Sequence, residues 1–200
     1  MGYLIAFILL GFAWGLSYLW LNRSSVTGID VHNPEGTTGR ALVVDHPGRG
    51  SFHVQVVSGY VEGLAEGGWR VERTTASRAT PTDLSGYDLL VLGTPTYWFS
   101  PSWPVVRYLR RLHDLEGRRA VTVVTGMGAA ERAAARLQKR VQAANGSLAQ
   151  GLLYYWMRPN DHENYVGTTQ NKALAVQMAT QAARALFQPA ESRTTREQHD

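Results

Sequence analysis

Residues 46–52, between an apolar run and a helical pattern, combine the residue types that hold a phosphate. Gly48 and Gly50 permit unusual backbone angles and a close approach of a ligand. Arg49 adds a charged donor and Ser51 adds a hydroxyl. A strand, a glycine-bearing loop and a helix N-terminus, in this order, direct backbone N–H groups at an anion. An ordinary glycine-containing turn between a strand and a helix is the alternative.

A second segment, residues 93–101, supplies groups that suit a flat aromatic ring. Pro95 stiffens the chain, and Thr94 and Thr96 supply hydroxyl groups. Three consecutive aromatic residues follow at 97–99, and such side chains stack on a planar ligand. Exposing them to water is unfavourable, so contact with a ligand or a membrane is favoured over an incidental cluster. Covering the edge of the sheet is the other interpretation.

A third segment, residues 125–128, again places paired glycines at the end of a predicted strand. Its backbone amides suit the edge of a ring, although a turn entering a helix explains the glycines almost as well. His46 lies where it could donate a proton to a ligand, but a structural role in the turn is favoured. No Ser-His-Asp arrangement, P-loop lysine or pair of catalytic carboxylates falls in the three segments, so no catalytic side chain is predicted. Residues 161–163, Asp-His-Glu, are interpreted as a solvated loop rather than a metal site.

Short apolar runs alternate with helix-like stretches from residue 41 onward. The predicted strands cover residues 41–44, 69–75, 89–93, 120–125 and 148–156. The predicted helices cover residues 52–66, 101–112, 129–145 and 170–187. We expect Pro101 and Pro104 in the first turn of the second helix, and Thr168 or Thr169 as the cap of the last.

Five strands that alternate with helices predict an α/β fold with a doubly wound, five-stranded parallel sheet covered on both faces. Ligands of such sheets bind beyond the carboxyl ends of the strands. The three segments described above all follow predicted strands. They are therefore expected to form one ligand site.

Residues 3–21 contain no charged side chain, and as a helix they span about 28 Å, close to the hydrocarbon thickness of a bilayer. A cleaved signal peptide is the alternative and fits less well, because the run is long and no basic side chain precedes it. We therefore predict a transmembrane helix at residues 1–22 that crosses the inner membrane once. Arg23 and Arg40 follow this helix, so the positive-inside rule places the soluble domain on the cytoplasmic side.

The rest of the chain divides into a linker at residues 23–40, a domain at 41–187 and a disordered tail at 188–200. The linker is polar, and no packed structure is expected there. The absence of cysteine excludes disulfides and a cysteine nucleophile. The net charge of +4 suits a protein near an anionic membrane and is far from the basic stripe of a nucleic-acid binder. Several arginines at 107–119 are interpreted as a solvated helix face, with anionic lipid as the alternative.

With these segments, the chain resembles the flavodoxin-like family, including its membrane-associated members and the related NAD(P)H:quinone oxidoreductases. The resemblance covers residues 40–187 and is best at 93–97, Gly-Thr-Pro-Thr-Tyr, which are similar to the family's G-[ST]-P-x-Y loop. It implies an FMN cofactor, with its phosphate at the first segment and its ring between the second and third. The implied cofactor-binding residues are Pro47, Gly48, Arg49, Gly50, Ser51, Phe52, Thr94, Pro95, Thr96, Tyr97, Trp98, Phe99, Thr125, Gly126, Met127 and Gly128.

The first segment departs from the family's [ST]-x-T-G-x-T pattern, because residues 46–51 read His-Pro-Gly-Arg-Gly-Ser and keep one hydroxyl. Arg49 is expected to compensate, since a charge-assisted hydrogen bond is about twice as strong as a neutral one. Loss of flavin from a retained fold is the alternative. Trp98 replaces a small residue that is frequent in the family and could fill the place of the ring.

The favoured hypothesis is a membrane-anchored flavodoxin-like protein that binds FMN and transfers electrons to or from a membrane redox partner or a quinone. The alternative is a non-catalytic accessory subunit of a membrane complex that keeps the fold without flavin. If the protein is an enzyme, the resemblance implies an FMN-dependent oxidoreductase of the NAD(P)H:quinone type. No nicotinamide site is located in the sequence.

Overall fold

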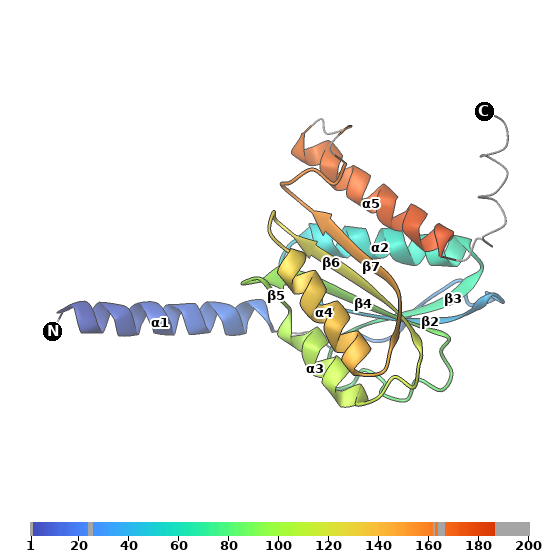
Figure 1. Cartoon of the computed structure of the whole chain (residues 1–200), viewed down its shortest axis with the longest axis horizontal. Coiled ribbons are helices and arrows are strands. Elements are labelled where there is room, and N and C mark those ends of the chain that lie inside the picture. Colours follow the sequence, from blue (N-terminus) through green and yellow to red (C-terminus); the bar gives the residue numbers. More distant parts are fainter. Residues whose placement is uncertain (1, 24–25, 162, 164–166, 187–200) are drawn as a thin grey trace.

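The chain forms an α/β domain from which one long helix projects (Figure 1). The computed structural model describes residues 2–23, 26–161, 163 and 167–186, and the predicted disordered tail lies outside them. The helices are α1 Gly2–Leu21, α2 Ser51–Glu66, α3 Trp103–Leu112, α4 Glu131–Ala143 and α5 Thr168–Ala185. The strands are β1 Asp30–His32, β2 Gly39–Asp45, β3 Trp69–Thr75, β4 Leu89–Tyr97, β5 Ser100–Pro101, β6 Arg119–Gly126 and β7 Ser147–Tyr155.

Five parallel strands form the main sheet in the order β3-β2-β4-β6-β7. Val43 of β2 lies opposite Arg73 of β3 on one side and Val91 of β4 on the other. The chain therefore passes from β2 outward to β3 and then returns to β4 on the other side of β2. This confirms the predicted doubly wound sheet, and it brings the carboxyl ends of β2, β4 and β6 to one edge.

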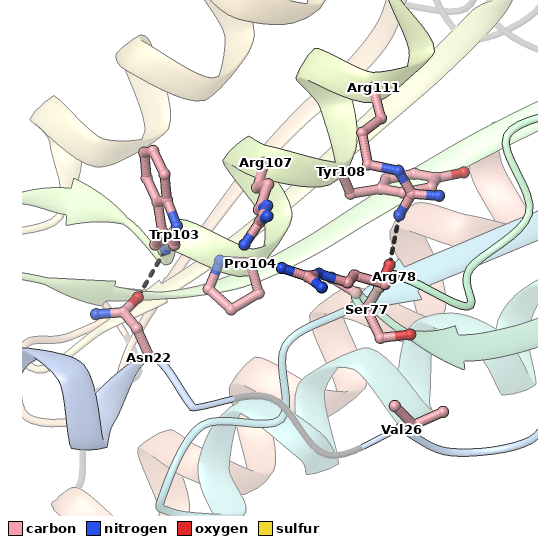
Figure 2. A pocket seen from close by; sticks show the side chains of 10 residues that line it. Asn22, Val26, Ser77, Arg78, Trp103, Pro104, Arg107, Tyr108 and Arg111 are labelled. Atoms are coloured by element: carbon pink, nitrogen blue, oxygen red, sulfur yellow. Dashed lines mark hydrogen bonds between the residues drawn. The ribbon is translucent and has the colours of Figure 1, made fainter.

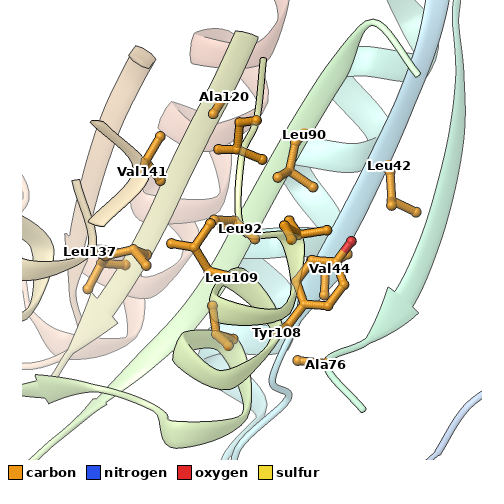
Figure 3. Packing of buried hydrophobic residues seen from close by; sticks show 14 of the residues in the cluster. Leu42, Val44, Ala76, Leu90, Leu92, Tyr108, Leu109, Ala120, Leu137 and Val141 are labelled. Carbon is orange, nitrogen blue, oxygen red and sulfur yellow. The ribbon is translucent and has the colours of Figure 1, made fainter. Parts of the chain in front are cut away.

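Two apolar cores cover the two faces of the sheet, because successive strand residues point to opposite faces. Leu42 and Leu90 belong to the core beneath α3 and α4 (Figure 3). Their neighbours Val43 and Val91 belong to the core beneath α2 and α5. Helices on both faces explain why these strands are apolar at consecutive positions rather than alternating.

Helices α2 and α5 pack closely because α2 carries two glycines at the contact. A Cβ at Gly63 would lie 2.3 Å from the Thr180 carbonyl oxygen, and one at Gly59 would lie 2.8 Å from the Val176 side chain. Thr180 Oγ1 also donates a hydrogen bond to the Gly59 carbonyl at 2.9 Å. The contact therefore has no room for a larger residue at Gly63.

Two segments differ from the expectations drawn from the sequence. The expectation of no packed structure at residues 23–40 is wrong, because β1 lies within this range and pairs antiparallel with β3. The loop expected at residues 93–101 is largely a hairpin, because β4 continues to Tyr97 and pairs antiparallel with β5. Within the described residues, the sheet thus has seven strands in place of the five expected.

Two helix starts are also corrected. Pro101 belongs to β5, so α3 begins at Trp103 with Pro104 in its first turn. Helix α5 begins at Thr168 directly after Gly167, and no side chain caps it. The predicted threonine cap is therefore wrong, because Thr168 and Thr169 both lie inside the helix.

Helix α1 is, within the described part of the chain, the one helix long and apolar enough to cross a membrane by length and composition. It projects away from the domain (Figure 1), and its large apolar side chains from Tyr3 to Trp14 are exposed. Contacts with the domain are made by Trp14, Trp20 and Leu21, in the second half of the helix. The end of α1 therefore has a defined position against the domain.

We predict that Gly63→Ala destabilises the fold, because the added Cβ meets the backbone of α5. Alanine is favoured over glycine within a helix by about 1 kcal/mol, but overpacking costs about 1–3 kcal/mol, so the clash should dominate. Denaturant unfolding of the full chain in detergent, followed by circular dichroism, measures the change. Gly28→Ala is the control, because nothing lies within 4 Å of its Cβ position. Equal stability of the two variants would contradict the packing described.

Candidate functional site

The carboxyl ends of β2, β4 and β6 bring the three predicted segments together at one edge of the sheet. We call this edge the rim and define it as residues 46–52, 94–101 and 125–128. The His46 backbone N–H donates to the Gly93 carbonyl at 3.1 Å, which joins the first segment to the second. Pro95 lies opposite Thr125 in the parallel register, which joins the second to the third. The residues implied by the resemblance thus lie in three adjacent segments, although Thr94 and Thr125 among them are buried.

The first segment presents the start of α2 to solvent. Gly50 precedes the helix in an extended conformation, no side chain caps the helix, and Ser51 is exposed. The first N–H groups of a helix lack partners within it and carry a partial positive charge. Gly48 has a φ of +71° and lies against Tyr97, whose phenol oxygen is 2.8 Å from the Gly48 Cβ position. This part of the rim can therefore hold an anion on backbone groups.

The side chains of the first segment point to the end of α1. Arg49 Nη2 donates to the Trp20 carbonyl, and the guanidinium lies 4.1 Å from the centre of the Trp20 ring. His46 Nε2 lies 3.1 Å from the Leu21 carbonyl oxygen, so the ring donates there as its Nε2–H tautomer. The last carbonyls of a helix lack partners within it and attract cations. Arg49 therefore caps α1, and its guanidinium is engaged away from the start of α2.

The hairpin between β4 and β5 contacts α1 further along the helix. Trp98 and Phe99 form its tip with φ values of +51° and +57°, which bulky residues rarely adopt. The Trp98 ring packs on the Trp14 ring at 4.5 Å between centres and remains 46% exposed. Trp14 lies about 10 Å from the end of α1, at 1.5 Å per residue. Trp98 is therefore turned toward α1 and is not buried against the sheet.

The two threonines of the second segment have different surroundings. Thr94 is fully buried, and its hydroxyl lies 2.9 Å from Ser102 Oγ and accepts the Ser102 N–H at 2.8 Å. It closes the base of the hairpin. Thr96 Oγ1 is buried and has no hydrogen-bond partner among the described residues. It lies 3.6 Å from the Cβ position of Gly126, so an unused hydroxyl faces the third segment.

A buried polar cluster lies below the rim and involves four side chains. Asp45 binds Arg73 through both carboxylate oxygens at 3.2 and 3.0 Å. His53 Nδ1 lies 2.9 Å from Thr125 Oγ1, and Nε2 lies 3.9 Å from the Asp45 carboxylate. Thr125 is 2% exposed, so its hydroxyl belongs to this cluster rather than to the open rim. The cluster joins the ends of β2, β3 and β6 to α2.

Burial lowers the pKa of His53 to about 4, and the Asp45 carboxylate only partly offsets this effect. The His53 ring is therefore neutral at pH 7, and its contact with Asp45 is not a salt bridge. Arg73 is the counterion of Asp45 instead. Burial also lowers the pKa of His46. At neutral pH both histidines act as uncharged hydrogen-bonding groups.

Asp45, His53 and Arg73 are not among the site residues predicted from the sequence. Asp45 has a recognisable signal, because a carboxylate directly follows an otherwise apolar strand run. His53 has one too, because it shares the buried face of α2 with Val56 and Tyr60. Arg73 gives none, since charged and apolar residues are mixed along β3 and burial decides which of them pair.

No protein-family model matches the sequence, and no curated protein matches it. Solved structures do share its fold. An NAD(P)H:quinone oxidoreductase from Methanothermobacter marburgensis has a TM-score of 0.56 and 16% identity, covering 76% of this chain and 98% of that one. An azoreductase from Bacillus anthracis str. Sterne has a TM-score of 0.57 and 12% identity, covering 73% and 99%.

A flavodoxin from the domain Archaea has a TM-score of 0.54 and 10% identity, covering 74% of this chain and 99% of that one. Identities this low establish the architecture alone. The chain has a flavodoxin-like fold, as the sequence resemblance implied. The assignment of the rim residues to a cofactor remains a prediction.

We predict that the free energy of unfolding falls as the pH is lowered from about 6.5 to about 4. In this range His53 and His46 bind protons in the unfolded chain but stay neutral in the folded chain, because their pKa values are lowered there. A pKa difference of about 2.5 corresponds to about 3 kcal/mol for His53. Denaturant unfolding of the full chain in detergent at several pH values measures this slope. His53→Asn should flatten it, whereas His113→Asn at an exposed site should not. A slope unchanged in His53→Asn would refute the assignment.

Proposed function

We propose that this chain is a membrane-anchored flavodoxin-like protein that binds FMN at the rim and exchanges electrons with a membrane redox partner or a quinone. The redox part is supported by the fold, which the chain shares with a flavodoxin and with an NAD(P)H:quinone oxidoreductase. The membrane part is supported by the length and composition of α1. The observation that carries the proposal is that the three segments meet at the carboxyl edge of a flavodoxin-like sheet.

The phosphate of FMN would lie at the start of α2. Its ligands would be the first N–H groups of the helix and the Ser51 hydroxyl, and Gly50 leaves the approach open. Arg49 does not add to these ligands while its guanidinium binds the Trp20 carbonyl. Arg49 was expected to compensate for the missing hydroxyl groups of the first segment. In this proposal backbone N–H groups bind the phosphate instead.

The ring of FMN would lie between the second and third segments. The unpartnered Thr96 hydroxyl offers a hydrogen bond to a polar edge of the ring. Tyr97 packs on the first segment, near His46, and would lie between the phosphate and the ring. When bound, FMN would supply the electron transfer, and the side chains of the rim would position the ring and exclude water from it.

The attachment of α1 determines which partners can reach the cofactor. Trp14 and Trp98 are in contact about 10 Å before the end of the helix, so the hairpin tip lies beside the anchor. If α1 crosses the bilayer, the rim faces the membrane surface. A quinone or a membrane-embedded redox protein would then meet the cofactor edge directly. Anchoring through α1 would also raise the effective concentration of the domain near such a partner.

The decisive experiment is an absorption spectrum of the full chain purified in detergent, which should show a bound flavin. Ser51→Asp should keep the fold, because a carboxylate is favourable at a helix N-terminus. It should weaken FMN binding about tenfold or more, because like charges about 4 Å apart repel by several kcal/mol near a surface. Gln55→Asp, which adds the same charge one turn later at an exposed site, is the control. A colourless protein that does not bind added FMN would exclude the redox function.

A second candidate is a non-catalytic subunit of a membrane complex that has lost flavin. It is favoured by the side chains of His46 and Arg49, which both bind the end of α1 rather than the start of α2. This candidate expects a colourless protein that co-purifies in a stable assembly. A free monomer in detergent that contains flavin would exclude it.

A further inference from the structure

A cavity of about 290 Å³ lies between the end of α1, the start of α3 and the chain that follows β3 (Figure 2). It is separate from the rim segments that would hold FMN. Asn22, Trp103 and Arg107 line one side, and Arg78 lies on the other. Asn22 Oδ1 accepts the Trp103 backbone N–H at 2.7 Å, so the residue directly after α1 is fixed to the cavity wall.

The cavity is strongly basic. Three of its ten lining residues are arginines, and none is a carboxylate. Arg111 is half-buried and donates to the Ser77 and Thr80 carbonyls, so it stiffens the wall. Arg78 and Arg107 are exposed and have no hydrogen-bond or ion-pair partner within the described ranges. Their guanidinium groups extend into the same space in Figure 2, where an anion between them would relieve their mutual repulsion.

The position of the cavity indicates the source of that anion. Asn22 follows Leu21, the last residue of α1, so the cavity lies at the level where an α1 that crosses a bilayer would leave the hydrocarbon. Lipid phosphates lie at this level. Trp103 lines the cavity, and tryptophan is enriched at the interface between membrane and water. The apolar lining residues Val26 and Pro104 suit the glycerol and upper acyl groups that follow the phosphate.

We infer that this cavity binds the phosphate of an anionic phospholipid headgroup, with Arg78 and Arg107 as its ligands. Guanidinium groups form paired, charge-assisted hydrogen bonds with phosphate. The lining has no carboxylate to receive the cationic group of a phosphatidylcholine, so phosphatidylglycerol should be preferred. The inference rests on the membrane anchoring in the proposed function and gives the domain a second point of attachment.

Native mass spectrometry of the full chain in detergent tests the site. The probes are dioctanoyl phosphatidylglycerol, dioctanoyl phosphatidylcholine and inorganic phosphate. We expect one phosphatidylglycerol to bind about tenfold more tightly than phosphatidylcholine, and the double variant Arg78→Gln/Arg107→Gln to lose this preference. The control Arg132→Gln/Lys139→Gln removes the same charge from the exposed surface of α4 and should keep it.

Equal binding of the two lipids to the wild-type chain would overturn the inference without reference to any variant. Equal loss of preference in the two double variants would also overturn it, because the effect would then reflect net charge. If inorganic phosphate displaces phosphatidylglycerol at an equal concentration, the site is one for free phosphate and the lipid assignment fails. The flavin absorbance of the same detergent preparations tests the proposed cofactor separately. Carbonate extraction of the membranes from which they were purified tests the proposed anchoring.

Discussion

The pairing of the last carbonyls of α1 with His46 and Arg49 is the interaction on which the arrangement depends. A helix end leaves carbonyl groups without partners, and here the first loop of the domain supplies the donors. The tilted contact of the Trp14 ring with the Trp98 ring adds a second attachment about two turns earlier in the helix. Together these contacts turn the carboxyl edge of the sheet toward α1. A domain on a free linker would have no preferred face toward the helix.

The same short loop lies between two helix ends of opposite polarity. The carboxyl end of α1 carries partial negative charge, and the amino end of α2 carries partial positive charge. The Arg49 side chain donates to a carbonyl at the end of α1. The backbone N–H groups after Gly50 have no side-chain cap and can donate to an anion at the start of α2. This division allows a loop with a single hydroxyl group to present backbone donors to an anion as well. The Asp45–Arg73 pair below holds the strand end in place.

The sequence predicted the architecture well, because apolar runs and helical periodicity report burial directly. It also predicted that three distant segments meet at one edge, since parallel strands align their carboxyl ends. It could not predict β1, a three-residue edge strand without an apolar pattern. It missed the hairpin because Trp98 and Phe99 occupy turn positions where glycine or asparagine is expected. The direction of the Arg49 side chain could not be predicted either, because it depends on Trp20 at the end of α1, which is 29 residues away in the chain.

The contact between α1 and the rim is tested most directly by cross-linking in native membranes. The chain has no cysteine, so Trp14→Cys combined with Trp98→Cys gives a single reactive pair for a short bifunctional thiol reagent. We expect an internal cross-link for this pair. We expect none for Tyr3→Cys with Trp98→Cys, because Tyr3 lies about 16 Å further along the helix. Absence of the first cross-link, or equal yields from both pairs, would contradict the account.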